Sequence, residues 1–138
     1  EDSLLKLAVY VPVSKADEVR EALFAAGCGN IGNYDCCSYN IEGTGTFRAG
    51  KNCTPYCGEI GHLHREKETR IETILPSYIK NRVVSALIKA HPYEEPAYDI
   101  YPLSNKWNNV GAGVVGTLPQ EADEQEFLLN IKKIFNPT

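Results

Sequence analysis

Residues 5–27 read LKLAVYVPVSKADEVREALFAAG and predict a strand followed by a helix. Apolar side chains recur at every second position from Leu5 to Val11, which is the period of a strand with one face in a core. Pro12 ends this strand, and Ser14 is a good N-cap with Asp17 three residues later. Gly27 stops the helix. The stripe expected to be buried consists of Ala16, Val19, Leu23 and Ala26.

The same order occurs again in the second half of the chain. Residues 69–75 alternate as a strand that ends at Pro76, and Ser77 is placed to cap a second helix. Pro92 excludes the helical conformation at His91 on steric grounds, so the helix ends there. Residues 97–103 form a short strand between prolines, at an edge of the sheet. The buried stripe of this helix is expected to be Ile79, Val83, Leu87 and Ala90.

A further strand is predicted over residues 34–41, and residues 43–66 show no clear periodicity. A connection of that length is uncommon in compact domains unless it is functional, so it is the first place to expect a site. The order of elements is strand-helix-strand twice. This predicts an α+β fold over residues 4–103, a ferredoxin-like split βαβ sandwich in which two helices cover a four-stranded antiparallel sheet.

Residues 104–138 do not belong to that unit. We predict a polar linker, a Gly-rich strand over 110–118 and a helix over 119–135. The helix has an apolar face of Leu128, Ile131, Ile134 and Phe135, which one strand cannot bury. The chain also begins at Glu and contains no Met. We therefore expect an interior piece of a longer polypeptide, whose tail re-enters a main domain that is absent.

Composition limits the classes of partner. The 138 residues carry a net charge of -4, which opposes a nucleic-acid partner held through many phosphates. No apolar run is long enough to span a membrane, and Leu4 to Val11 does not follow a basic segment as in a secretory signal. We expect a cytoplasmic protein whose five cysteines are free thiols.

Four side chains with metal-binding chemistry lie within twelve positions of the long connection: Cys53, Cys57, His62 and His64. Zinc takes thiolate and imidazole ligands, and two histidines at i and i+2 share a face of an extended chain. The spacing is not that of a known zinc finger. The alternative is two free loop thiols and two exposed imidazoles.

The remaining motifs are weaker. Cys36 and Cys37 fall on opposite faces of the second predicted strand and are expected to pack in the core or an interface. Cys28 has no positive neighbour in sequence that would activate it. The glycines of 111–116 match G-x-G-x-x-G, but no apolar strand precedes them, so tight packing explains them better than a dinucleotide does.

Residues 91–96 read HPYEEP, in which two rigid prolines flank an imidazole, a phenol and two carboxylates. Such a loop presents its side chains at low entropic cost, and the His and the acids can bind a divalent cation or transfer protons. The alternative is a helix-to-strand corner with solvated acids and a buried Tyr.

Three ordered motifs carry a family resemblance: GNIGNYD at 29–35, EGTGTF at 42–47 and HPYEEPAYD at 91–99. Together with residues 7–12 they resemble the middle domain of the Nif-three-like family, also called GTP cyclohydrolase I type 2 or dinuclear-metal-binding proteins. The tail 111–118 resembles the G-x-G-R-x-G-x-L segment of that family, with Val114 where the family has Arg.

The resemblance implies a domain similar to the trimeric PII and CutA proteins. The family's pair of divalent metals is held by flanking segments, so it implies no cofactor in this segment, and the family's label as a metal-dependent hydrolase leaves open whether this segment is catalytic. We expect a non-catalytic module that forms a homo-oligomer, possibly based on a trimer, and regulates the metal site of a larger protein. The alternative is a binder of a small ligand or divalent cation in the PII and CutA manner, and autonomous hydrolysis ranks last. The residues expected to contact a ligand or partner are Tyr34, Asp35, Thr44, Phe47, Arg48, His91, Tyr93, Glu94 and Glu95.

Overall fold

The computed structural model describes residues 3–105, 113 and 115–135. The chain divides into two units, residues 1–107 and 108–138, which are treated separately below. The first unit contains all the strands of the described chain, and the second contains one helix.

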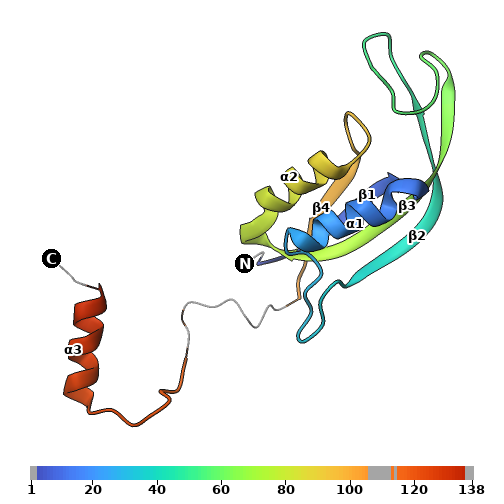
Figure 1. Cartoon of the computed structure of the whole chain (residues 1–138). Helices are drawn as coiled ribbons and strands as arrows, with labels where there is room; N and C mark the ends of the chain where they lie inside the picture. The colour runs from blue at the N-terminus through green and yellow to red at the C-terminus, as the bar shows by residue number, and fades with distance from the viewer. Residues whose placement is uncertain (1–2, 106–112, 114, 136–138) are drawn as a thin grey trace. The chain divides into compact units, whose positions relative to one another are not determined.

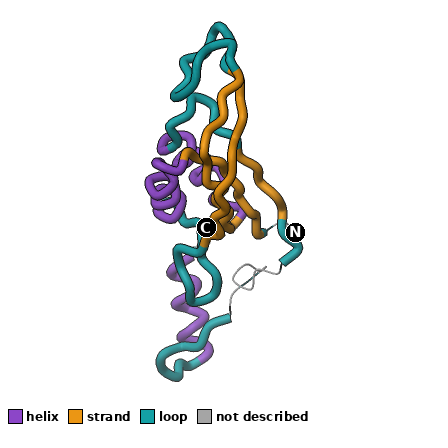
Figure 2. Tube along the Cα trace, turned by 90° about the vertical axis from the view of Figure 1, so that its right-hand side faces the viewer, coloured by secondary structure: helices purple, strands orange, loops and turns teal. Residues whose placement is uncertain are grey.

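The first unit is an antiparallel sheet with two helices on one face (Figures 1 and 2). The strands are β1 (Leu4–Pro12), β2 (Ser38–Arg48), β3 (Leu63–Pro76) and β4 (Tyr98–Pro102), and the helices are α1 (Ala16–Ala25) and α2 (Lys80–Ala90). The strand order is β2-β3-β1-β4, so β1 and β3 are central while β2 and β4 are edges. The predicted α+β, ferredoxin-like arrangement is confirmed, including the edge position of the fourth strand.

The core lies between the sheet and the two helices. The predicted stripes of both helices supply it, with Val19 and Leu23 from α1 and Val83 and Leu87 from α2 fully buried. Each such side chain contributes about 1.5–3 kcal/mol through its removal from water. Their partners on the sheet are Leu7, Val9, Val11, Ile71 and Leu75. This core positions the strand ends and loops that form the site.

The predicted serine caps are not present. Ser14 and Ser77 each lie in a 3-10 turn, Val13–Lys15 and Ser77–Ile79, and neither α1 nor α2 has a side-chain cap. The 3-10 turns bond the amides of Ala16 and Lys80 to backbone carbonyls three residues earlier, so no hydroxyl is needed there. The prediction that Pro92 ends the second helix is confirmed, because α2 ends at Ala90 and His91 is extended.

The predicted long connection at 43–66 is wrong. β2 continues through Gly43 and Gly45 to Arg48, and β3 already begins at Leu63, so only residues 49–62 form the loop. Figure 1 shows this hairpin extending beyond the helices, with its loop at the far end. The parts of β2 and β3 nearest this loop do not alternate between apolar and polar residues, because no helix covers them. Without that alternation the sequence gives no strand signal over residues 43–66, so the connection is predicted longer than it is.

β3 changes its buried face along its length. From Thr69 to Leu75 the odd-numbered side chains are buried, whereas from His64 to Glu68 the even-numbered ones are less exposed than their neighbours. The inner half therefore packs on the core, and the outer half turns its other face toward loop 49–62 and residues 91–97. This change of face creates the polar site described below.

The second unit contains α3 (Glu124–Phe135). It begins later than the predicted residue 119, because Asp123 accepts hydrogen bonds from the amides of Gln125 and Glu126 and so fixes the start. Its apolar side chains are exposed, with Ile134 and Phe135 each 76% exposed. Of the Gly-rich strand predicted at 110–118, residues 113 and 115–118 are not in a strand, and the others, Val114 included, lie outside the described residues. No helix of the described chain combines the length and apolar character that a membrane crossing requires.

Candidate functional site

A pocket of about 740 Å³ lies along the outer half of the hairpin. Its walls come from four segments: β2 from Ile41 to Arg48, β3 at Glu68 and Arg70, loop residues 52–56 and residues 93–97. Tyr10 of β1 also contributes. The register places Tyr10 opposite Arg70, and the Arg70 guanidinium lies 5.7 Å from the centre of the Tyr10 ring. The pocket thus combines aromatic surface with charged groups of both signs.

Tyr93 is anchored at the pocket by a buried carboxylate. Its hydroxyl donates a 2.9 Å hydrogen bond to Oε1 of Glu68, whose residue is 8% exposed. Burial raises the pKa of Tyr93, and the Glu68 carboxylate raises it further. The phenol therefore stays protonated and acts as a donor. Gly45 makes room for this carboxylate, because a Cβ at that position would lie 2.6 Å from Cδ of Glu68.

His91 is held as a neutral ring by two backbone groups. Its Nδ1 accepts a 3.0 Å bond from the amide of Tyr93, so the ring proton is on Nε2, which donates to the Tyr10 carbonyl at 2.9 Å. Burial lowers the pKa of His91, and the Tyr10 carbonyl and the Glu68 carboxylate oppose this only in part. The histidine thus fixes the corner between α2 and β4, and it presents no free ring nitrogen.

An aromatic cluster surrounds Tyr93. The rings of Phe47 and Tyr56 lie 5.9 and 6.0 Å from that of Tyr93, and His91 lies 5.0 Å away. Phe47 also lies 5.2 Å from the ring of His64, which faces it across the β2–β3 ladder. Tilted and edge-on aromatic contacts of this kind stabilise by about 0.5–1.5 kcal/mol each. The cluster fixes loop 49–62 and the 91–97 segment on the hairpin.

Arg70 leaves one donor without a partner. Its Nη2 bonds Glu72 at 2.8 Å, but its Nε is buried and has no hydrogen-bond partner among the described residues. A buried unpaired donor costs about 1–3 kcal/mol.

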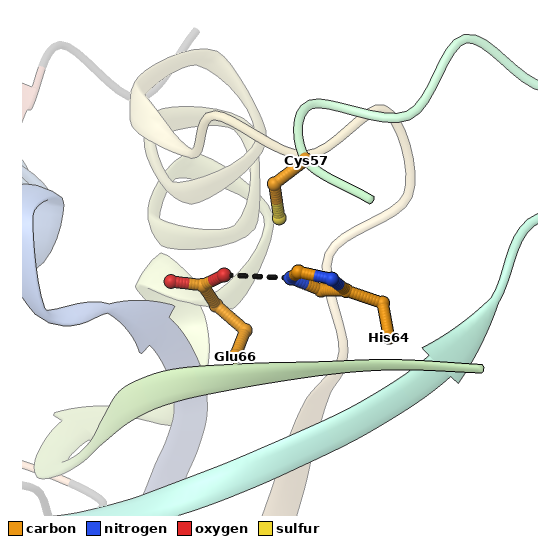
Figure 3. Close-up of side chains that lie close together, drawn as sticks. All are labelled: Cys57, His64 and Glu66. Carbon is orange, nitrogen blue, oxygen red and sulfur yellow. Dashed lines mark hydrogen bonds and ion pairs between the residues drawn. The ribbon is translucent and has the colours of Figure 1, made fainter. Parts of the chain in front are cut away.

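Cys57, His64 and Glu66 converge beside the pocket. Figure 3 shows the Cys57 sulfur pointing toward the side chains of His64 and Glu66. One ligand atom from each lies within 4.8 Å of the others, and His64 Nε2 and Glu66 Oε2 are 2.8 Å apart. The hydrogen bond from His64 lowers the pKa of Glu66, and burial raises the pKa of the Cys57 thiol.

The structure brings together most of the residues singled out from the sequence. Lining the pocket are Thr44, Phe47, Arg48, Cys53, Tyr93, Glu94 and Glu95. Glu94 also accepts a 3.3 Å bond from the amide of Thr54, which ties the loop to this wall. Tyr34 and Asp35 lie in the turn before β2 and do not line the pocket, and Tyr34 is 75% exposed. His91 lies behind Tyr93 rather than on the pocket surface.

The four metal candidates from the sequence do not form one group. Cys57 and His64 meet, whereas Cys53 and His62 are outside the group of three and are exposed. His62 instead lies 3.2 Å from Glu59. Sequence reasoning missed Glu66, Glu68 and Arg70, which look like solvated charges of an exposed strand. The available signal was the spacing of two from His64, which puts these side chains on its face of β3.

The other cysteines differ from expectation. Cys36 and Cys37 are not on a strand but in the turn before β2, where Cys36 is exposed and has a φ of 52°. The predicted core packing of this pair is therefore wrong. Cys28 is buried in the core cluster, and burial raises its pKa to about 12, with Arg82 opposing in part. Its role is packing.

Comparison with known proteins places the chain in a family. No family model matches it. A protein of Halalkalibacterium halodurans named GTP cyclohydrolase 1 type 2 homolog is 48% identical over 135 residues, 98% of this chain and 36% of that protein. The Bacillus subtilis protein of the same name is 46% identical over 131 residues, 95% of this chain and 35% of its own length. A solved Bacillus cereus protein related to NIF3 has a TM-score of 0.67 and 44% identity, covering 96% of this chain and 34% of its own.

The chain belongs to the NIF3-like family. It spans about a third of the length of the NIF3-like relatives it matches, at 36% and 35% of the two proteins above. The periplasmic divalent cation tolerance protein CutA of Archaeoglobus fulgidus shares the fold, with a TM-score of 0.56 and 12% identity over 77% of this chain and 89% of its own. The NIF3-like segment therefore has a CutA-like fold.

Proposed function

We propose that this segment is a non-catalytic module that assembles copies of a NIF3-like protein and thereby regulates it. The observation that carries the proposal is the free edge of β2. Within the described residues this strand of 11 residues pairs only with β3, so its outer edge presents backbone groups for another strand. Its apolar side chains Tyr39 and Ile41 are 69% and 44% exposed.

A second copy of the chain is the occupant that this edge fits. A strand added to an open edge gains backbone hydrogen bonds, and apolar side chains along the edge add burial. Most homo-oligomers have closed symmetry, and in a cyclic trimer the β2 edge of one copy meets a different surface of the next copy. A trimer is the expected state, from the resemblance to PII and CutA proteins.

The polar groups of the site also support a non-catalytic role. His91 has both ring nitrogens engaged with the backbone, and the Tyr93 phenol is tied to Glu68. Cys28 is in the core with a raised pKa. These groups act in packing and positioning. The reaction of the whole protein is then expected to reside in the two thirds of its relatives' length that this chain does not cover.

The test is the mass of the purified chain in solution. We expect sedimentation at micromolar concentration to show a discrete oligomer, and Ile41→Lys on the β2 edge to dissociate it. Ile88→Lys is the matched control, because Ile88 is 50% exposed on α2 and lies beside β4, the strand at the opposite edge of the sheet from β2. A stable monomer, or an oligomer that only Ile88→Lys dissociates, contradicts the proposal.

The pocket favours a second candidate, the binding of a small molecule. Arg70 lies in the pocket wall and brings positive charge for an anion, and the aromatic wall of Phe47, Tyr56 and Tyr93 is suited to a planar ring. The relatives' name suggests GTP as the probe, since its phosphates and purine match these two features. Calorimetric titration with GTP is expected to give saturable binding that Arg70→Met weakens and Arg65→Met, on an exposed side chain of the same strand, leaves unchanged. Absence of saturable binding excludes this ligand.

A further inference from the structure

We propose that Cys57, His64 and Glu66 form a binding site for Zn²⁺. The site goes beyond the oligomerising role and does not depend on it. It also differs from the four metal candidates named from the sequence, because it keeps Cys57 and His64 but has Glu66 in place of Cys53 and His62.

The three ligand atoms are of the kinds that zinc prefers. A thiolate, an imidazole nitrogen and a carboxylate oxygen bind zinc at about 2.0–2.3 Å, so ligand atoms of a tetrahedral site lie about 3.3–3.8 Å apart. Here all three lie within 4.8 Å of one another. The pair His64 Nε2 and Glu66 Oε2, at 2.8 Å, is slightly closer than that range. Small side-chain rotations suffice to admit the ion.

The backbone holds two of the ligands in place. His64 and Glu66 are two residues apart on β3, so both side chains leave the same face of the strand. They are half-buried rather than solvated, with side-chain exposures of 28% and 29%. Phe47 packs on the His64 ring at 5.2 Å and limits its rotation. Sites with fixed ligands lose little conformational freedom when they bind a metal.

The third ligand depends on a tight turn beside it. Gly58 has a φ of +81°, and a Cβ there would lie 2.8 Å from Cγ of His64. Only glycine lets the loop come this close to the ring in that conformation. The close approach brings Cys57 to His64 (Figure 3).

The surroundings supply the outer contacts that metal ligands usually have. The Cys57 sulfur lies 4.0 Å from the Tyr93 hydroxyl, which is itself bonded to Glu68. Groups that contact a metal ligand in this way orient it, and their loss lowers metal affinity by about 10–100-fold in other proteins. Loss of a ligand itself should therefore lower the affinity by more than about 100-fold.

Binding has a defined proton balance and one open position. The Cys57 thiol gives its proton to solvent as the sulfur–zinc bond forms. The hydrogen bond between His64 and Glu66 is replaced by two bonds to the ion, and the proton of that hydrogen bond leaves Nε2 through solvent, so that the neutral ring carries its proton on Nδ1. The fourth position is left for water or an outside ligand. Because Cys57 belongs to loop 49–62, the ion would cross-link that loop to β3 and fix the loop wall of the pocket.

Zinc binding by the purified 138-residue chain tests the proposal. The chain is stripped with a chelator, dialysed against Zn²⁺ and analysed for bound metal, and its affinity is measured by competition with a chromophoric chelator. We expect about one zinc per chain. Cys57→Ser, His64→Gln and Glu66→Gln should each weaken binding more than about 100-fold. Co²⁺ in place of Zn²⁺ should give the intense visible bands of a tetrahedral thiolate site, which Cys57→Ser abolishes.

Two variants serve as matched controls. Cys53→Ser removes an exposed thiol of the same loop, and His62→Gln removes an exposed imidazole two residues before His64. Both should bind zinc as tightly as the parent. Circular dichroism of each variant verifies that the fold is kept. Absence of stoichiometric zinc overturns the proposal, as does loss of zinc in Cys53→Ser or His62→Gln with retention in Glu66→Gln.

Discussion

The hydroxyl of Tyr93 donates a 2.9 Å hydrogen bond to the buried carboxylate of Glu68 and so connects the α2–β4 segment to the outer half of the hairpin. Neither residue belongs to the helix-covered core cluster. The bond is the point at which the aromatic cluster, the pocket and the three metal-binding side chains meet. Changes at this contact should therefore affect the site more than the core.

Tyr93→Phe is expected to lower the free energy of unfolding by about 1.5–3 kcal/mol, since a buried carboxylate loses its hydrogen-bond donor. Urea denaturation measures the change. Tyr78→Phe is the control, because Tyr78 is 76% exposed and should change stability by less than about 0.5 kcal/mol. Equal effects of the two substitutions would show that the Glu68 contact adds nothing.

Gly45→Ala is expected to destabilise the hairpin by about 1–3 kcal/mol, because the new methyl group must displace the Glu68 carboxylate from Tyr93. Gly43 lies two residues earlier on the same strand, and a Cβ added there would have no heavy atom within 4 Å. Gly43→Ala should therefore be neutral or stabilising by up to about 1 kcal/mol. Paired denaturation curves compare the two, and a larger loss at Gly43 would refute the close-packing argument.

His91 makes stability depend on pH near neutrality. Burial lowers its pKa below the ordinary 6.5, so the unfolded chain takes up the proton more readily than the folded one. The contribution of His91 is complete above about pH 7.5 and is lost as pH falls through 6.5 toward the folded pKa. Unfolding free energies measured between about pH 8 and 5.5 should show this slope.

The difference in stability between the parent and His91→Gln should shrink as pH falls across that range. His62→Gln is the control, because the His62 side chain is 78% exposed. Its profile should follow that of the parent. A constant difference between the parent and His91→Gln would contradict a buried neutral imidazole.

Cys28 is expected to resist alkylation. Its residue is 1% exposed and burial raises its pKa to about 12, whereas Cys36 and Cys53 are exposed. Iodoacetamide at about pH 8 should modify Cys28 at least about a thousandfold more slowly than the exposed thiols, because reaction requires unfolding. Peptide mapping by mass spectrometry follows each site, and comparable rates for Cys28 and Cys36 would disprove the burial argument.

The same burial makes the chain less stable in base. The folded state keeps the Cys28 thiol protonated. The contribution of Cys28 to the free energy of unfolding is therefore complete below the ordinary pKa of 9.0 and is lost as pH rises from 9.0 toward 12.

The sequence predicted the helix-covered core well because that core follows regular periods. Val19, Leu23, Val83 and Leu87 recur at helical spacing, and the structure buries all four. The outer hairpin has no such pattern, since a loop covers it instead of a helix. The strands expected from periodicity are therefore shorter than those of the structure, and periodicity does not assign the charged side chains of the hairpin to a site.

The site could be predicted only in part for the same reason. Phe47 and Tyr93 were found through their motifs, and both lie at the pocket. The spacing of two places Glu66 and Glu68 on the same face of β3 as His64, but their neighbours on β2 depend on the strand register, which pairs Gly45 with Glu66 and Gly43 with Glu68. A register of this kind depends on contacts between strands, so single-strand periodicity does not reveal it.

The change of buried face within β3 divides this strand into two parts that differ in their resistance to local unfolding. Amides from Thr69 onward are held by the helix-covered core, so their exchange with solvent follows global unfolding. Those from His64 to Glu68 depend on a loop and a few aromatic contacts, so they can open while the rest of the domain stays folded. The outer part of β2 and β3, with loop 49–62, can thus change in loop length and in ligand residues during evolution without unfolding the rest of the domain.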